Sequence, residues 1–115
     1  MDRTLTFFML LKSTPAWLGM TRAERTAFIE ERIQPIFARY SAVTLRFYDT
    51  EALSGRCTDV AVWETSDLRQ YTFLIDALRD TPFFARPYFE VIEIIPGIED
   101  SYRDYDQAML AQAAS

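Results

Sequence analysis

Four strand-like segments and two helical segments follow one another in the order strand, helix, strand, strand, helix, strand. The strand-like runs cover residues 4–11, 43–48, 57–64 and 88–95, and the helical runs cover residues 21–40 and 65–79. Right-handed crossovers bring this order to a four-stranded antiparallel sheet with both helices on one face. The sequence therefore predicts an α+β domain of the ferredoxin-like βαββαβ class.

The first helix has a clear start and an internal break. Thr21 followed by Glu24 fits a capping box, in which each side chain satisfies a backbone N–H of the first turn. Pro35 lies inside the helical pattern, where it removes a backbone hydrogen bond. We expect it to kink or split the helix near Gln34.

The alternation of side chains predicts which face of each strand meets the helices. In the second strand the core set is Val43, Leu45 and Phe47. In the third strand we expect Val60 and Val62 toward the core, and Asp59, Ala61 and Trp63 on the helix-free face. The last strand offers two sets, and we favour one for the helix-free face: Tyr88, Glu90, Ile92 and Ile94, rather than Phe89, Val91, Glu93 and Ile95.

The helix-free face would then be too apolar to face water. Tyr48, Ala61 and Trp63 would lie there beside apolar residues of both outer strands. Pairing two sheets across a two-fold axis is the usual way to seal such a face. The sequence therefore predicts a homodimer, arranged as a dimeric α+β barrel.

The length of 115 residues fits one domain, for which we expect residues 1–105. Residues 106–115 are rich in Ala and read as a C-terminal tail or a short helix. The apolar run near the N-terminus spans only about nine residues between charged ones, too few to cross a membrane. It has no small-residue cleavage site, so we expect no signal peptide and a cytoplasmic location.

The charge pattern argues against two classes of partner. Seventeen acidic residues outnumber twelve basic ones, for a formal charge of −5, and the bases are scattered. Nucleic-acid binding requires a clustered basic stripe, and docking on an anionic membrane requires a basic patch. We therefore expect neither a nucleic acid nor a membrane as a partner.

The chain contains no histidine and no asparagine, and only one cysteine. A Ser–His or Cys–His nucleophile pair and an imidazole metal or haem ligand are therefore impossible, as is an internal disulfide. The three glycines, Gly19, Gly55 and Gly97, are too far apart to form a phosphate-binding loop. The sequence predicts no metal and no cofactor.

One group of polar and aromatic residues is a candidate pocket within the barrel: Arg46, Tyr48, Asp59, Trp63 and Glu90. An enclosed Arg46 can hold a carboxylate or an enolate, while Asp59 or Glu90 moves a proton. The structural alternative is an ion pair of Arg46 with Asp59 that seals the barrel, with the aromatic residues as interface core. Both interpretations remain open at this stage.

Four further features each have a functional and a structural interpretation. Cys57 beside Arg56 is either an activated thiol or a small buried hydrophobe. The loop of residues 49–56 is a lid or a plain hairpin loop. An acidic cluster either binds a cation or starts a solvated helix; it consists of Glu99, Asp100, Asp104 and Asp106. An aromatic cluster either caps a ligand or packs in the core; it consists of Phe83, Phe84, Tyr88 and Phe89.

Several segments, spread from residue 6 to residue 105, resemble the darcynin family of small bacterial proteins. They include Ala16-Trp17-Leu18, Gln34-Pro35-Ile36-Phe37, Arg46-Phe47-Tyr48-Asp49, Val62-Trp63-Glu64-Thr65 and Pro96-Gly97-Ile98-Glu99-Asp100. The resemblance implies a domain of unknown function in a bacterial, cytoplasmic setting. It implies no catalytic residues.

Three functions fit the sequence. The first is a small-molecule-binding domain with an apolar or aromatic ligand, since its pocket is aromatic with few polar groups. The second is a cofactor-independent isomerase, lyase or monooxygenase acting on an acidic aromatic or enolisable substrate. The third is a structural dimerisation module without a ligand.

Overall fold

The computed structural model describes residues 3–114 and has the predicted α+β fold. Its four strands are β1 (Leu5–Ser13), β2 (Thr44–Asp49), β3 (Asp59–Thr65) and β4 (Phe89–Gly97). They form one antiparallel sheet in the order β2-β3-β1-β4, which confirms the ferredoxin-like class. Residues 1, 2 and 115, at the ends of the expected domain and tail, lie outside the described residues.

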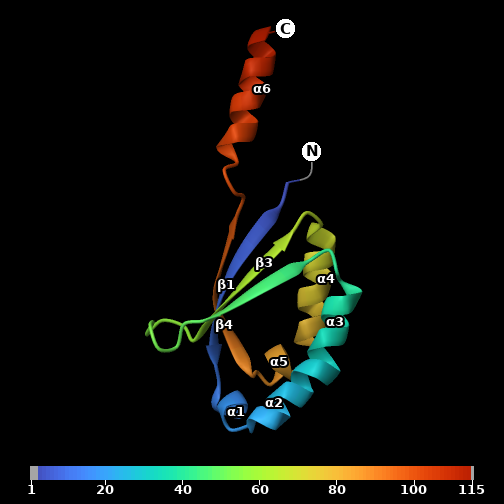
Figure 1. Ribbon diagram of the computed structural model, residues 1–115, viewed down its shortest axis with the longest axis vertical. Coiled ribbons are helices and arrows are strands. Elements are labelled where there is room, and N and C mark those ends of the chain that lie inside the picture. The colour runs from blue at the N-terminus through green and yellow to red at the C-terminus, as the bar shows by residue number, and fades with distance from the viewer. Residues whose placement is uncertain (1–2, 115) are drawn as a thin grey trace.

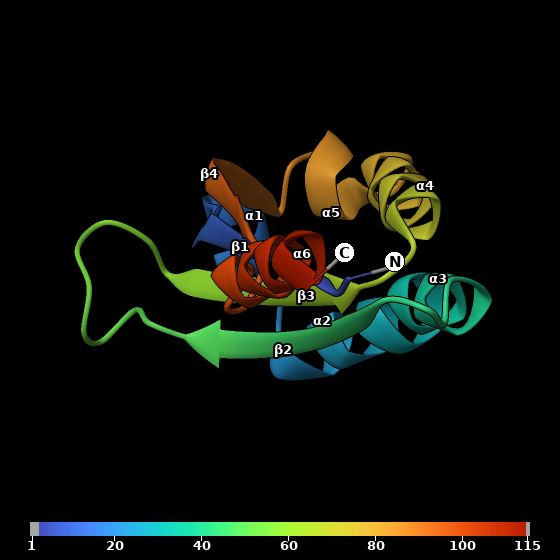
Figure 2. The ribbon, with the colours of Figure 1, turned by 90° about the horizontal axis from the view of Figure 1, so that it is seen from above.

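The helices form a second layer on one face of the sheet, as Figures 1 and 2 show. After β1 come α1 (Pro15–Leu18), α2 (Arg22–Phe28), the π-helical segment η1 (Ile29–Ile33) and α3 (Gln34–Arg39). After β3 come α4 (Leu68–Arg79) and α5 (Pro82–Ala85). The chain ends in α6 (Tyr102–Ala114), which begins inside the range expected for the domain and projects away from its body.

The predicted helix start is confirmed. The hydroxyl of Thr21 accepts a hydrogen bond from the Glu24 N–H at 3.1 Å, and the Glu24 carboxylate accepts from the Thr21 N–H at 2.8 Å. The hydrogen bond from the Thr21 backbone N–H, together with its hydroxyl, lowers the pKa of the Glu24 carboxyl, because a hydrogen-bonded carboxylate is favoured in its charged form. At the start of α4 the Asp67 carboxylate caps the Gln70 N–H in the same manner.

Pro35 splits the first helix as predicted, and the break takes the form of a π segment. Pro35 is the second residue of α3, which directly follows η1. Its nitrogen carries no hydrogen and cannot donate the usual helical hydrogen bond, and its ring would clash with the carbonyl of Glu31, four residues earlier. The wider turn of η1 lies around that carbonyl, and it directs the buried Ile33 toward the sheet.

The predicted face of β3 is wrong. Trp63 and Ala61 are 2% and 0% exposed, and both belong to the core beneath the helices. The Trp63 ring meets the ring of Phe37 from α3 at 5.9 Å and that of Tyr71 from α4 at 6.5 Å. The register Leu45↔Trp63 explains this, because opposite residues of paired strands share a face and Leu45 points to the core.

The face predicted for β4 is wrong for Tyr88, which is buried in the core, and for Ile94, which lies opposite the buried Met9. Lys12 pairs with Glu90 and Leu11 with Val91, but Leu10 then pairs with Glu93, so the register shifts by one residue. This bulge reverses the side-chain alternation within the strand. The helix-free face therefore carries Glu90 from the favoured set, and Glu93 and Ile95 from the other.

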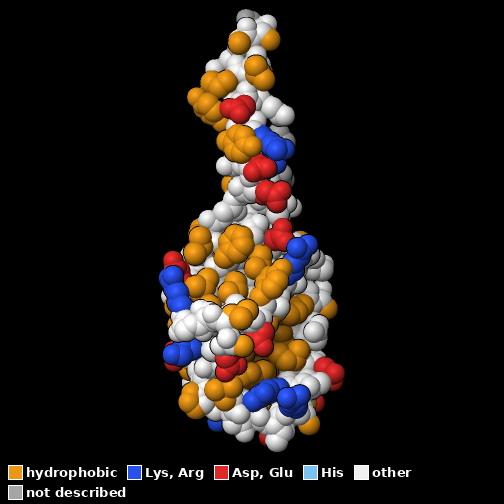
Figure 3. Space-filling view, turned by 60° about the vertical axis from the view of Figure 1, so that its left-hand side comes forward, with side chains coloured by type: hydrophobic (Ala, Val, Ile, Leu, Met, Phe, Trp, Pro, Cys, Tyr) orange, Lys and Arg blue, Asp and Glu red, His pale blue; other side chains and the backbone are white. Residues whose placement is uncertain are grey.

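The helix-free face of the sheet, called here the open face, is largely apolar. Figure 3 brings it forward and shows hydrophobic side chains gathered over the strands, with charged residues around them. Phe8, Tyr48 and Ile95 are 43–50% exposed there. The predicted apolar open face is thus present, but it carries Leu10, Val60 and Val62 in place of Ala61 and Trp63.

We predict that Thr21→Ala lowers the free energy of unfolding by about 1 kcal/mol, because it leaves a backbone N–H of α2 without its cap. Urea unfolding followed by circular dichroism measures the effect. Thr26→Ala, an exposed position within the same helix, is the matched control and should leave stability unchanged or slightly higher. Equal effects of the two substitutions would contradict a role for the capping box.

Candidate functional site

A cavity of about 220 Å³ lies between the helix layer and the sheet. All four strands and most of the helices contribute to its wall. The lining residues are Leu11, Trp17, Ile29, Ile33, Phe37, Leu45, Phe47, Ala61, Trp63, Leu78, Phe83 and Phe89. The cavity therefore lies on the opposite side of the sheet from the pocket that the sequence predicted.

The small side chain of Ala61 leaves this space open at the centre of the sheet, and the ring of Trp17 bounds it at one end. Ala61 is fully buried on the central strand β3, where a larger side chain would extend toward the helices. Trp17 closes the lower end from α1. Arg25 of α2 holds α1 in place, donating to the carbonyls of Trp17 at 3.1 Å and Leu18 at 2.9 Å, with its guanidinium 5.6 Å from the Trp17 ring.

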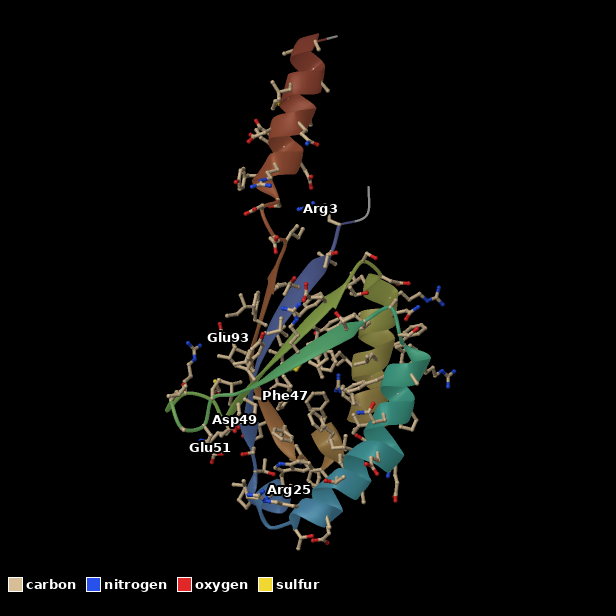
Figure 4. All side chains as sticks on the ribbon, in the orientation of Figure 1. Arg3, Arg25, Phe47, Asp49, Glu51 and Glu93 are labelled. Carbon is tan, nitrogen blue, oxygen red and sulfur yellow. The ribbon has the colours of Figure 1, made fainter. Side chains whose placement is uncertain are left out.

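Aromatic contacts surround the cavity and leave one side accessible. Phe89 is the hub of this shell, with ring centroids 5.2 Å from Trp17, 4.9 Å from Phe83 and 6.3 Å from Phe47. Phe47 lines the cavity and is 48% exposed, so it stands at the entrance. Figure 4 shows its side chain in the space between the sheet and the helices.

The surface exposed inside the cavity consists of hydrocarbon. The indole N–H of the lining residue Trp63 is buried and has no hydrogen-bond partner among residues 3–114. The cavity can therefore bind a molecule by excluding water, but it offers no group for acid–base chemistry.

The structure separates the five residues of the predicted pocket. Arg46, Tyr48 and Glu90 lie on the open face, whereas Asp59 and Trp63 lie on the helix side, so the expected common face is wrong for these two. Arg46 and Glu90 also stand on opposite edge strands and at different levels, since Arg46 lies in line with Val62, Phe8 and Ile95. Of the five, Trp63 lines the cavity.

The pKa of the Asp59 carboxyl is raised above its ordinary value. Partial burial at the end of β3 is the main cause, and the nearby carboxylates of Asp49 and Glu51 add to it. The Thr58 hydroxyl, which donates to Asp59 Oδ2 at 2.8 Å, opposes the shift. Figure 4 labels Asp49 and Glu51 at this end of the β2–β3 hairpin.

The remaining sequence features have structural partners. Cys57 is buried, with its Sγ 3.4 Å from the Thr50 hydroxyl. The hairpin loop lines no part of the cavity, and its Arg56 forms an ion pair with Glu93 of β4. In the acidic cluster, Asp104 pairs with Arg3 at 3.0 Å and Asp100 pairs with Arg103 at 3.5 Å.

Two negative findings concern residues 3–114. No group of three or more Cys, Asp or Glu side chains is placed to hold a metal ion. No helix combines the length and the apolar character that crossing a bilayer requires.

The structure defines a small α+β domain whose fold resembles that of chlorite dismutases. One chlorite dismutase from Candidatus Nitrospira defluvii, solved in complex with imidazole, aligns over 83% of this chain with a TM-score of 0.69 at 12% identity. A dimeric chlorite dismutase from Nitrobacter winogradskyi aligns over 84% with a TM-score of 0.61 at 20% identity. This chain spans 39% and 57% of their respective lengths, and the likeness concerns the fold alone.

The chain belongs to the Darcynin family, a domain of unknown function, whose profile matches residues 1–114. It is 54% identical over 80 residues to Darcynin of Chromobacterium violaceum, covering 70% of this chain and 100% of that one. It is 52% identical over 99 residues to a Darcynin homolog of Streptomyces avermitilis, covering 85% and 81%. The predicted resemblance and the bacterial setting of the relatives are thus confirmed.

We predict that Asp59→Asn is more stable than the parent chain at pH 7, and that the difference disappears on acidification. A raised pKa means that the folded state binds the Asp59 proton more tightly than the unfolded state. Stability is therefore lost as pH rises from the ordinary value of 3.8 through the folded pKa, and the amide avoids this loss.

Urea unfolding of both chains at pH 3, 5 and 7 measures this difference. Glu30→Gln, which neutralises an exposed carboxylate on η1, is the control and should show no such pH-dependent gain. An Asp59→Asn chain that is less stable than the parent at pH 7 would contradict the burial of the Asp59 charge.

Proposed function

We propose that this domain binds a small apolar or aromatic molecule in the cavity between its sheet and its helices, and that it does so as a homodimer. The cavity itself is the observation that carries the binding proposal. Its volume of about 220 Å³ exceeds the ~150 Å³ of a hydrocarbon-lined cavity that stays dry and admits benzene. An apolar space of this size is costly to leave unfilled, because its lining atoms lose dispersion contacts.

The lining restricts the class of ligand to uncharged molecules of one or two rings. A charged or strongly polar group would lose its hydration inside without gaining a hydrogen bond. Aromatic rings at Trp17, Phe83 and Phe89 favour edge and stacked contacts with a second ring system. Entry past the half-exposed Phe47 requires only a rotation of that side chain.

The open face supports the homodimer. Its apolar residues form a patch that a single copy leaves in contact with water, and burial against a second copy removes that contact. A protein of the same fold, from Nitrobacter winogradskyi, is described as dimeric. A cytoplasmic location stays a prediction from the sequence.

Binding without turnover fits the described residues better than the enzymatic alternative. That alternative needs Arg46 beside Asp59 or Glu90, and these three side chains lie on different faces or opposite edges of the sheet. A site assembled between two copies would be required to bring them together. No specific observation favours such a site.

We predict that Ala61→Leu abolishes ligand binding, because three added carbons project from β3 into the cavity. Benzene and indole serve as probes in place of an unidentified ligand. Both tryptophans of the chain line the cavity, so tryptophan fluorescence reports benzene entry directly, and calorimetry measures indole binding. We expect at least a tenfold loss of affinity for both probes.

Ala52→Leu makes the same substitution in the exposed hairpin loop and should leave binding unchanged. Unfolding experiments on both variants show that the fold is retained. The proposal fails if the parent chain binds neither probe, or if Ala61→Leu binds both as tightly as Ala52→Leu.

A further inference from the structure

α6 exposes several large apolar side chains. None of its 13 residues is buried. Tyr102, Tyr105 and Met109 follow at intervals of three and four, so they lie on one side of the helix, and Leu110 flanks them. Isolated helices of this length are marginal in water. A stable α6 therefore requires a surface on which this stripe can pack.

The surface area of the chain points to a large missing contact. A compact monomer of 13.4 kDa exposes about 6,500 Å², whereas this chain exposes 7867 Å². Its radius of gyration is 17.6 Å, against about 13 Å for a compact domain of this length. The excess of about 1,400 Å² per copy is in the range that homodimer interfaces bury.

We infer that α6 is an arm that docks on the open face of a second copy, while the second copy's α6 docks on the first. This inference rests on the proposed homodimer, and it states which part of the dimer interface α6 forms. The docking site is a groove at the end of the sheet where β1 begins and β4 ends, with Phe8, Tyr48 and Val62 among its lining residues.

The groove lies at the end of the sheet from which α6 leaves its own domain. A short connection of residues 98–101 joins β4 to α6, and Figures 1 and 3 show the helix leading away from the sheet. The ion pair of Arg3 with Asp104 holds the helix start beside the start of β1. A two-fold axis beside this connection would bring each arm to the partner's groove, so the exchange is reciprocal.

One charged residue of the groove and one of the arm are opposite in sign and unpaired within the described part of the chain. Arg46 lies in the groove and forms no ion pair among residues 3–114. Asp106 interrupts the apolar side of α6, three residues before Met109, and it too lacks an ion pair among the described residues. The inference pairs Asp106 of each arm with Arg46 of the other copy.

The groove also carries two carboxylates, one of which can find hydrogen-bond donors in this arrangement. Glu64 and Glu99 line the groove on the side of the β1 start. The phenol hydroxyls of Tyr102 and Tyr105 are exposed donors on the apolar side of the arm. They can donate to Glu64, which would otherwise oppose the approach of Asp106.

A charge exchange at this contact tests the inference. Asp106→Arg and Arg46→Asp should each raise the dimer dissociation constant about tenfold, because each places like charges together. The double variant restores an opposite pair in both contacts, so its dissociation constant should return to within about threefold of the parent value. Sedimentation equilibrium of the full chain measures all four constants.

The control reversals are Asp76→Arg on α4 and Arg22→Asp on α2, which are exposed and outside the groove. They should leave the dissociation constant unchanged. A chain ending at residue 101 lacks the arm and should dimerise at least 100-fold more weakly than the full chain, while benzene binding is retained.

The outcomes separate the arm from the proposed homodimer and from the ligand. A chain ending at residue 101 that dimerises as tightly as the full chain would overturn the arm and leave the dimer standing. Failure of the double variant to recover would also overturn the inference, since it assigns these two residues to one contact. A full chain that stays monomeric at about 100 µM would overturn both arm and dimer.

Discussion

The pairing of β3 with β1 determines what each face of the sheet can do. In this register Ala61 opposes Met9 and Trp63 opposes Phe7, and the other β3 neighbours point to the open face. The largest ring on the sheet and the smallest side chain thus lie under the helices together. A slip by one residue would exchange the two faces, placing Val60 and Val62 in the core and exposing Trp63 to solvent. The register therefore produces both the cavity and the moderately apolar open face.

The helix layer is shaped to leave the cavity open. Pro35 produces the π segment that directs Ile33 to the sheet, while α1 and α5 close the lower end with Trp17 and Phe83. Aromatic rings are stiff, and the shell around Phe89 consists of rings in edge and stacked contact. Rigid walls of this kind resist collapse into the void, which is the condition for a preformed binding site.

Much of the fold could be predicted from the sequence because its signals are local. The position of each strand and helix along the chain, the Thr21 capping box and the break at Pro35 each depend on a few adjacent residues. The face of β3 could not, because both of its alternating sets are apolar enough for a core. The length of the β2–β3 loop did not identify the buried face of β3 either. β2 ends at Asp49 and β3 begins at Asp59, two residues after the start at Cys57 that the sequence predicted.

The candidate site could not be predicted from the sequence, because it depends on the bulge in β4 and on the buried face of β3, which local patterns do not reveal. The bulge in β4 reverses its alternation midway, so no single set of residues describes one face. With β3 reversed as well, Asp59 and Trp63 were expected beside Arg46 and are found on the other side of the sheet. One sequence feature did indicate the cavity. Ala61 is a small residue between large ones in a central strand, so it leaves space between the sheet and the helices that cover it.

A crystal structure of the full chain under xenon pressure tests the central claim most directly, since xenon enters apolar cavities that water leaves empty. The account predicts a xenon peak between Ala61, Phe47 and Phe89, with the surrounding rings unmoved. A structure in which Phe47 or Trp17 has rotated inward and no xenon binds would contradict it.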